Sequence, residues 1–264
     1  MPKVCEIAQY FEQRVPARLK LDFDNVGLLA GYSEKEVHRV LVALDVTLEV
    51  IQEAKDWGAE LIVSHHPIIL DGVKEIVDST PRGRRLTALL ESGLSAICLH
   101  TNLDSVDGGV NDALAEALGV NVLEVVEPIG EGPDGKPAGL GRVCELPDET
   151  SMEMFLKTVQ DRLHVSGLRF YDAGRPVGKI TVCGGSGGDL IYDAAACGCD
   201  TCLTGEIRYH HWLDGKELGL NLIEADHFCT ENVVTPVLRE MMLEGFPGLD
   251  VKISEVHNQT AKGL

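Results

Sequence analysis

The chain has 264 residues, of which 44% are hydrophobic, 5% aromatic and 25% charged, as is typical of soluble globular proteins. Lys and Arg total 23 against 42 Asp and Glu, and the resulting net charge of −19 argues against a nucleic-acid partner. No apolar run approaches the roughly 18 residues needed to span a bilayer, which argues against a membrane partner.

The first residues and the cysteines both favour a cytoplasmic protein. The stretch MPKVCEIAQYFEQRVP carries charges throughout and has no apolar core of signal-peptide length. Eight cysteines without secretory features fit free thiols in a reducing compartment better than a disulfide scaffold. We therefore expect a cytoplasmic location.

Strands and helices alternate along the first half of the chain. After a helix at 6–15, the β-branched run VHRVLVALDV predicts a buried strand, and Thr47 and Gly58 are placed to begin and end the next helix. The pattern then predicts a strand at 60–64, a helix at 82–92, a strand at 94–100, a helix at 109–119 and a strand at 121–129. Strands separated by helices of this length favour parallel pairing.

A glycine-rich segment interrupts this alternation. GEGPDGKPAGLG, residues 130–141, holds five glycines and two prolines and predicts a loop. A second βα-rich run follows further along the chain. We therefore predict an α/β protein of two lobes with largely parallel sheets: an N-terminal lobe at 1–127, an intervening segment at 128–177 and a C-terminal lobe at 178–264.

Histidine and carboxylate side chains follow three of the predicted strands, ELIVS, LSAICLH and NLIE. Parallel βα proteins collect their functional residues at such carboxyl ends. His227 and Glu231 are four residues apart, so a helix would place both side chains on one face. The side chains are His65, His66, His100, Asp104, His227 and Glu231.

Imidazole and carboxylate together favour borderline divalent ions such as Zn, Mn, Fe, Co or Ni. A single catalytic ion usually takes three protein ligands, whereas five strong candidates with one bridging carboxylate fit two ions about 3.5–4 Å apart. The five are His65, His66, Asp104, His227 and Glu231, with His100 as a sixth.

Each of these residues also has a purely structural interpretation. The pair His65 and His66 is also typical of a surface loop, and Asp104 can cap a turn or the following helix. His227 and Glu231 can form a pair on the surface of a helix. The residue types alone leave both interpretations open.

The order and spacing of several motifs resemble the Nif-three-like family, whose members carry the name GTP cyclohydrolase 1 type 2. The motifs are DNVGLLAG (24–31), SHHP (64–67), HTNLD (100–104), TGE (204–206) and the HxxxE stretch (227–231). The resemblance covers nearly the whole chain. It implies a two-lobed α/β fold, a ring-like homohexamer, and a dinuclear metal centre between the lobes, held by His65, His66, Asp104, His227 and Glu231.

The resemblance also suggests a hydrolase that acts on a small nucleotide-like substrate. With GTP, a metal-bound hydroxide would attack the imidazole ring of the guanine and open it, and we expect His100 to transfer protons beside the centre. Two alternatives stay open: a non-catalytic oligomer that stores, delivers or senses metal or serves as a scaffold, and a phosphoesterase that uses the same two metals. Family members often have Gly where this chain has Asp226, so hydrogen bonding beside His227 is expected to differ.

Three further motifs have both a functional and a structural interpretation. VCGGSGG (182–188) is a turn that could present N–H groups to an anion or could serve only as a tight connection. CGCDTC (197–202) has no second cysteine pair nearby to close a zinc site, which favours small buried thiols. The resemblance places Glu206 at the wall of a cavity, and His210 and His211 are candidates for contacts behind the ligands or for a helix surface.

Overall fold

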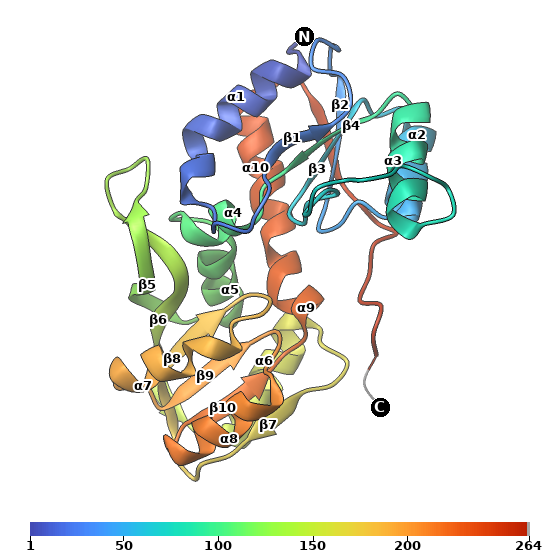
Figure 1. Ribbon diagram of the computed structural model, residues 1–264. Coiled ribbons are helices and arrows are strands. Elements are labelled where there is room, and N and C mark those ends of the chain that lie inside the picture. Colours follow the sequence, from blue (N-terminus) through green and yellow to red (C-terminus); the bar gives the residue numbers. More distant parts are fainter. Residues whose placement is uncertain (263–264) are drawn as a thin grey trace. The chain divides into compact units, whose positions relative to one another are not determined.

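The computed structural model describes residues 1–262 and divides the chain into two compact units, each built around one sheet (Figure 1). Unit 1 comprises Met1–Leu103 and Val234–Asn258. Unit 2 comprises Asp104–Val233 and the tail that starts at Gln259. Helix α4 (Thr101–Ser105) contains the first boundary between them.

This division differs from the expected boundaries at 127 and 177 for two physical reasons. Residues 250–253 return to the first sheet, where they pair with residues 39–42, so the last part of the chain belongs with the first. The expected intervening segment, 128–177, contributes strands to the second sheet and does not stand apart from it.

Unit 1 is a five-stranded sheet in the order β1-β4-β3-β2-β11. The last four strands in that order pair in parallel, and β1 is antiparallel to β4. The strands are β1 (Gly27–Ala30), β2 (Arg39–Ala43), β3 (Leu61–Ser64), β4 (Ser95–Cys98) and β11 (Asp250–Ile253). Figure 1 shows α1 (Val4–Arg14) and α10 (Thr235–Gly245) on one face of the sheet, and α2 (Leu48–Trp57) and α3 (Pro81–Glu91) on the other. The 3-10 turn η1 (Ala17–Leu19) follows α1.

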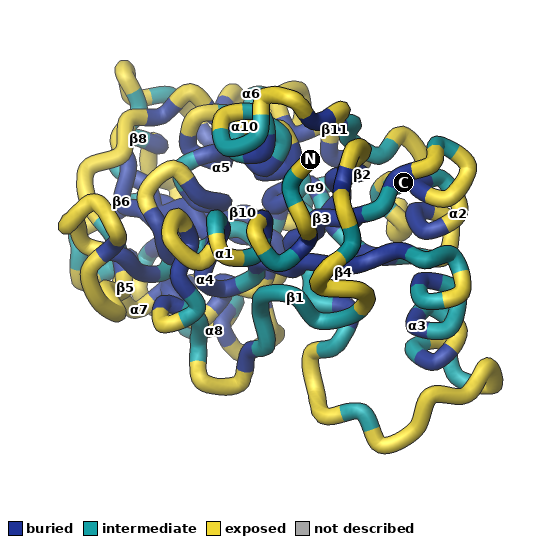
Figure 2. Tube along the Cα trace, turned by 90° about the horizontal axis from the view of Figure 1, so that it is seen from above, coloured by how far each residue is buried: buried dark blue, intermediate teal, exposed yellow. Residues whose placement is uncertain are grey.

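Local sequence signals explain these elements. The Thr47 hydroxyl accepts a hydrogen bond from the Val50 N–H at 3.2 Å, and Gly58 ends α2 in the left-handed conformation with φ 77°, as predicted. The β-branched and leucine side chains of β2 and β3 are buried, and these strands form the centre of the unit (Figure 2).

Unit 2 is a six-stranded mixed sheet in the order β5-β6-β8-β9-β10-β7. Its strands are β5 (Asn121–Glu131), β6 (Pro137–Thr150), β7 (Arg169–Tyr171), β8 (Val177–Cys183), β9 (Thr201–Thr204) and β10 (Asn221–Glu224). Its helices are α5 (Val110–Leu118), α6 (Met152–Leu163), α7 (Ile191–Ala196), α8 (Tyr209–Glu217) and α9 (His227–Glu231), with 3-10 turns η2 (Gly188–Leu190) and η3 (Asn232–Val234). The longest described helix, α6, has 12 residues, and no helix among residues 1–262 is long and apolar enough to cross a membrane.

The α/β prediction is confirmed, and parallel pairing predominates in unit 1. In unit 2 only β8, β9 and β10 pair in parallel. The glycine-rich segment 130–141, predicted as a loop, forms the tip of the β5–β6 hairpin, with Gly130 opposite Ala138. Its glycines allow close strand approach, since a Cβ on Gly139 would lie 2.0 Å from the Glu127 carbonyl oxygen.

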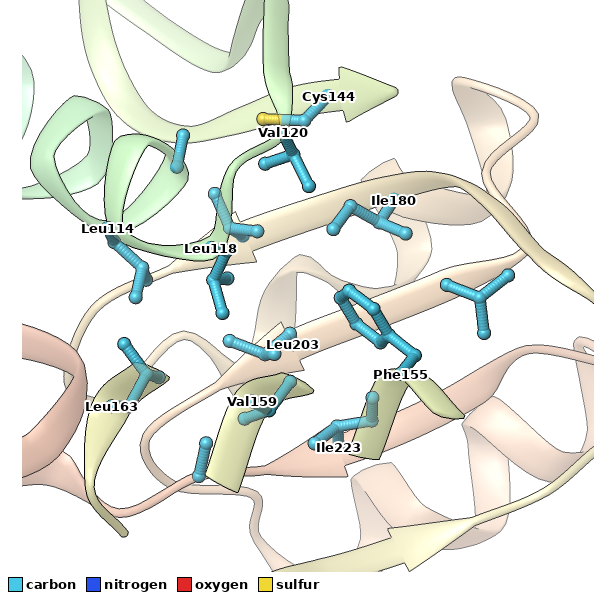
Figure 3. Close-up of a cluster of buried hydrophobic side chains, with 14 of the residues drawn as sticks. Leu114, Leu118, Val120, Cys144, Phe155, Val159, Leu163, Ile180, Leu203 and Ile223 are labelled. Carbon is cyan, nitrogen blue, oxygen red and sulfur yellow. The ribbon is translucent and has the colours of Figure 1, made fainter. Parts of the chain in front are cut away.

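Two cores lie on opposite faces of the unit 2 sheet because neighbouring strand residues point to opposite sides. Leu203 in β9 packs with residues of α5 and α6, including Leu114 and Phe155 (Figure 3). The next residue back, Cys202, packs on the other face with Ile191 of α7. This alternation fixes which helices cover each face.

The cysteines of CGCDTC belong to this second core, as the small-thiol interpretation predicts. Cys199 and Cys202 are buried, and Cys197 ends α7 with intermediate exposure. Burial raises the pKa of the Cys202 thiol to about 11 and that of the Cys199 thiol to about 12. All eight cysteines are free thiols.

Removing the ring of Phe155 should destabilise unit 2 strongly. Phe155 is 2% exposed in the core of Figure 3, so Phe155→Ala should lower the free energy of unfolding by about 3–5 kcal/mol. Urea unfolding can be followed by Trp212 fluorescence in a Trp57→Phe background, since the chain has two tryptophans, one in each unit. The neighbouring control Met154→Ala, at a side chain 58% exposed, should change stability by less than about 0.5 kcal/mol. Equal effects of the two variants would contradict the burial of Phe155.

Thiol reactivity should separate the exposed cysteines from the buried ones. At pH 8 an aromatic disulfide reagent should react quickly with Cys5 and Cys197, which are partly exposed, and with the other six only after denaturation. The burst should disappear in a Cys5→Ser, Cys197→Ser variant. Fast reaction of Cys199 or Cys202 in the native protein would contradict their raised pKa values and their burial.

Candidate metal site

Three histidines of unit 1 lie together at the carboxyl edge of its sheet. Since β3 and β4 are parallel neighbours, the segments that leave them start side by side. His65 and His66 directly follow β3, and His100 is the second residue after β4. The ring centroids are 5.0 Å apart for His65 and His66, 5.2 Å for His65 and His100, and 5.5 Å for His66 and His100. One ring nitrogen of each lies within 4.8 Å of the others.

The end of β3 explains how adjacent histidines reach one place. Inside a strand their side chains would point to opposite faces. At Ser64 the chain leaves the sheet, and the Ser64 hydroxyl donates to the His66 carbonyl oxygen at 2.9 Å. The His66 N–H donates to the Leu44 carbonyl at 2.8 Å, which fixes the turn. His65 is fully buried, whereas 21% of the His66 side chain is exposed.

Each of the three rings is held through its Nδ1 atom. The partners are acceptors: a backbone carbonyl in one case and a carboxylate in the other two. Because these partners accept, the proton of a neutral ring lies on Nδ1, and Nε2 keeps the lone pair with which it can bind a metal. The contacts are His65 to the Leu99 oxygen at 2.8 Å, His66 to Asp45 Oδ1 at 2.8 Å, and His100 to Asp24 Oδ1 at 2.7 Å.

Both supporting carboxylates are ionised. Burial by itself would raise the pKa of Asp24, but its hydrogen bonds with His100 and Thr101 outweigh burial and hold that pKa well below the usual range. Burial would also raise the pKa of Asp45, and hydrogen bonds from His257 and His66 lower it well below the usual range. Each carboxylate is therefore a hydrogen-bond acceptor for its histidine at neutral pH.

Sequence reasoning did not assign these two carboxylates a role. Asp24 precedes β1, and its Oδ2 accepts from the Thr101 N–H at 3.0 Å and from the Thr101 hydroxyl at 2.5 Å. Asp45 is the second residue after β2, at the same edge as the histidines. The signal for Asp45 was available, because it is a carboxylate just past a predicted strand. No local pattern ties Asp24 to His100.

The other three candidate ligands lie in unit 2. Asp104 is on α4, and His227 and Glu231 are the first and last residues of α9, so the expected helical spacing is confirmed. His227 Nε2 lies 3.0 Å from Glu231 Oε2, a separation that two ligands of one ion can have with bonds of about 2.1 Å. Carboxylate oxygens of Asp104 and Glu231 lie within 4.8 Å of each other. Glu231 is only 4% exposed.

His227 is oriented in the same way as the histidines of unit 1. Its Nδ1 lies 2.9 Å from Glu206 Oε1, which gives the TGE motif a direct role. Asp226 has φ 65°, in the left-handed region that glycine adopts readily, and its carboxylate accepts from the Cys229 N–H at 3.1 Å. Asp226 therefore begins α9 as its N-cap.

The glycine-rich turn makes room for α9. A Cβ on Gly185, where φ is 61°, would lie 2.1 Å from Glu231 Oε1 and 3.2 Å from His227 Nε2. The Gly185 N–H also donates to the Thr230 hydroxyl at 3.1 Å. A side chain on Gly184 would lie 3.1 Å from Glu231 Cγ. Close approach to the candidate ligands is therefore a sufficient reason for these glycines.

The two histidines after the TGE motif lie on α8. His211 is buried, His210 is exposed, and their rings are 4.0 Å apart. Burial lowers the pKa of His211. His210 is therefore a helix-surface residue, in line with the structural interpretation.

The donor atoms in each unit are of types that bind divalent transition metals. Unit 1 offers three imidazoles whose Nδ1 atoms are held, and unit 2 offers one such imidazole and two carboxylates. Nitrogen and oxygen donors of this kind suit Zn, Mn, Fe, Co and Ni. Carboxylate–histidine pairs behind a ligand are the usual way in which proteins orient metal-binding imidazoles.

Two relatives illustrate how far the sequence is shared. A protein of Clostridium perfringens named GTP cyclohydrolase 1 type 2 homolog is 38% identical over 261 residues, which cover 98% of this chain and 97% of that protein. A Streptomyces coelicolor protein of the same name is 36% identical over 235 residues, 88% of this chain and 82% of that one.

The fold is shared with solved structures of bacterial proteins. A hypothetical protein of Staphylococcus aureus matches with a TM-score of 0.92 and 28% identity over 99% of each chain. A Bacillus cereus protein related to NIF3 matches with a TM-score of 0.91 and 25% identity over 100% of each chain. The profile of one family, Duf34/NIF3 (NGG1p interacting factor 3), matches residues 2–261. The chain belongs to the Duf34/NIF3 family.

Proposed function

We propose that this protein is a metal-dependent hydrolase of a small nucleotide-like substrate, with opening of the guanine imidazole ring of GTP as its candidate reaction. One observation carries the metal part of the proposal: four candidate histidines are all held through Nδ1 by an acceptor. A structural histidine on a surface has no need of such a shared arrangement, whereas histidines that must present Nε2 to a metal ion or to a proton do. The four are His65, His66, His100 and His227.

We propose two ions per chain. Two bound divalent ions would lower the pKa of a water shared between them and polarise the group under attack. The ions are Zn, Fe, Mn, Co or Ni, all of which accept this donor set. The ligands are His65, His66, Asp104, His227 and Glu231.

His100 is the residue that we assign to proton transfer. Its Nδ1 is held by Asp24, so its Nε2 is the atom that can take up or release a proton. The ionised carboxylate of Asp24 stabilises the imidazolium that forms when Nε2 gains a proton. Of its side chain, 17% is exposed, which leaves the ring partly accessible.

The names of the relatives support the proposed substrate class. Those at 38% and 36% identity carry the name GTP cyclohydrolase 1 type 2 homolog, which supports GTP as the first substrate to test. The chain is acidic, with a net charge of −19, so bound cations would provide the local attraction that an anionic nucleotide needs. We also propose a homohexamer, as the resemblance implies.

Metal content should establish whether the ligand set acts together. Untagged protein purified without chelator should hold about two metal ions per chain by elemental analysis, and a His66→Ala, Glu231→Ala variant should lose them. A His38→Ala, His210→Ala variant removes two exposed histidines and should keep the wild-type content. A wild-type protein that holds no metal and takes up none of the five ions would overturn the proposal.

Turnover should separate an enzyme from a metal carrier. With the identified ion, His65→Ala and Asp104→Ala should lower kcat/KM for GTP at least about 100-fold, because ligand loss removes several kcal/mol of transition-state stabilisation. His100→Ala should keep the metal and lose about 100-fold in kcat. Reversible metal loading without turnover would support the storage or delivery role, and hydrolysis of phosphate esters instead of GTP would support the phosphoesterase.

A further inference from the structure

Asp45 connects two histidines that are far apart in the sequence. Its Oδ1 accepts from His66 Nδ1 at 2.8 Å, and its Oδ2 accepts from His257 Nε2 at 2.8 Å. The His257 side chain is only 11% exposed, whereas that of Asp45 is 35% exposed. Both oxygens of the carboxylate are thus engaged by imidazoles, and the contact with His257 restricts the rotation of the carboxylate.

The pairing of β2 with β11 brings the two residues together. The strands run in parallel, with Ile253 opposite Val42, so both leave the sheet at the same edge. Asp45 is the second residue after β2, and His257 is the fourth after β11. The register of this pair therefore sets the distance between the carboxylate and His257.

The segment after β11 is fixed on unit 1 by contacts of its own. The Ser254 N–H donates to the Val42 carbonyl at 2.8 Å, and the Ser254 hydroxyl donates to Glu53 Oε2 at 2.5 Å. The Glu255 N–H donates to Glu53 Oε1 at 3.1 Å. These contacts hold the backbone that carries His257, so removing the imidazole alone should leave the segment in place.

The other carboxylate–histidine pair is supported differently. The second oxygen of Asp24 is held by Thr101, the residue next to His100 in the chain. The second oxygen of Asp45 is held by a residue 212 positions further along. His66 therefore depends on a distant support that His100 does not need.

We infer that His257 is a positioning residue for His66. By fixing the Asp45 carboxylate it keeps the proton of His66 on Nδ1 and the ring in the orientation that presents Nε2. The inference rests on the proposed function in so far as His66 is a metal ligand. Its effect on the tautomer of His66 holds for the metal-free protein as well.

Two substitutions separate positioning from a merely structural role. His257→Ala removes the N–H donor, whereas His257→Gln can place a side-chain N–H near the same point. Asn258→Ala, at the adjacent residue, is the control, since the Asn258 side chain donates to the backbone of Val256 and not to Asp45. All variants are compared as full chains by circular dichroism and by the melting temperature in chelator.

The first readout is the tautomer of His66, from ¹⁵N–¹H correlation spectra of the metal-free protein. The wild type, His257→Gln and Asn258→Ala should show the Nδ1–H form, and His257→Ala should show a tautomer mixture. The second readout is zinc affinity by competition with a chelator. His257→Ala should weaken the binding of one ion about tenfold, as loss of a contact behind a metal ligand typically does, and His257→Gln should restore it.

The outcomes distinguish this inference from the proposed function. If the wild type binds no metal, the proposed function fails while the tautomer experiment still tests His257. An unchanged His66 tautomer and unchanged zinc affinity in His257→Ala would overturn the inference alone. A lowered melting temperature of His257→Ala in chelator that His257→Gln does not restore would also overturn the inference, because that result would assign His257 a structural role.

Discussion

The parallel pairing of β11, β2, β3 and β4 is the constraint on which the chemistry of unit 1 depends. Parallel neighbours end at one edge of a sheet, so the residues that follow them meet whatever their separation in sequence. Asp45 follows β2, His65 and His66 follow β3, His100 follows β4, and His257 follows β11. Four segments that share no sequence motif thereby supply a cluster of imidazoles and the Asp45 carboxylate, which orients His66. An antiparallel order would send alternate stretches to the opposite edge.

The burial of the Asp24 carboxylate is unfavourable for stability by itself. An ionised side chain loses hydration when it is buried, and replacement of such pairs by apolar residues is often neutral or stabilising. Asp24 is 6% exposed and yet remains ionised, because His100 and Thr101 donate to both of its oxygens. Natural proteins keep buried charged groups of this kind mainly at functional sites. Asp24 therefore supports a functional interpretation of His100 beyond what the residue types indicate.

Sequence reasoning recovered what local chemistry determines. The cap at Thr47, the left-handed Gly58, the end of β3 at Ser64 and the helical spacing of His227 and Glu231 are all local, and all are confirmed. What it missed depends on pairing between distant segments. No periodic signal in the sequence marks the pairing of β11 with β2, the antiparallel pairs of unit 2, or the contacts of Asp45 and Glu206. Any strand of similar composition could take the same place in a sheet. Gly184 and Gly185 are intermediate between these two groups. The sequence shows that they are glycines, but it does not show that they make room for Glu231 and His227.

The discontinuity of unit 1 links its folding to its site. Its sheet is complete only when residues 250–253 have paired with β2, and the same pairing delivers His257 to Asp45. The Thr101 support of Asp24, by contrast, lies entirely within residues 1–103. The support of His66 therefore depends directly on the pairing of β11 with β2, whereas the support of His100 does not. Long-range strand pairing is the slow and entropically costly step of such a fold. A metal that His66 ligates would consequently be bound well only by a chain in which that pairing is complete.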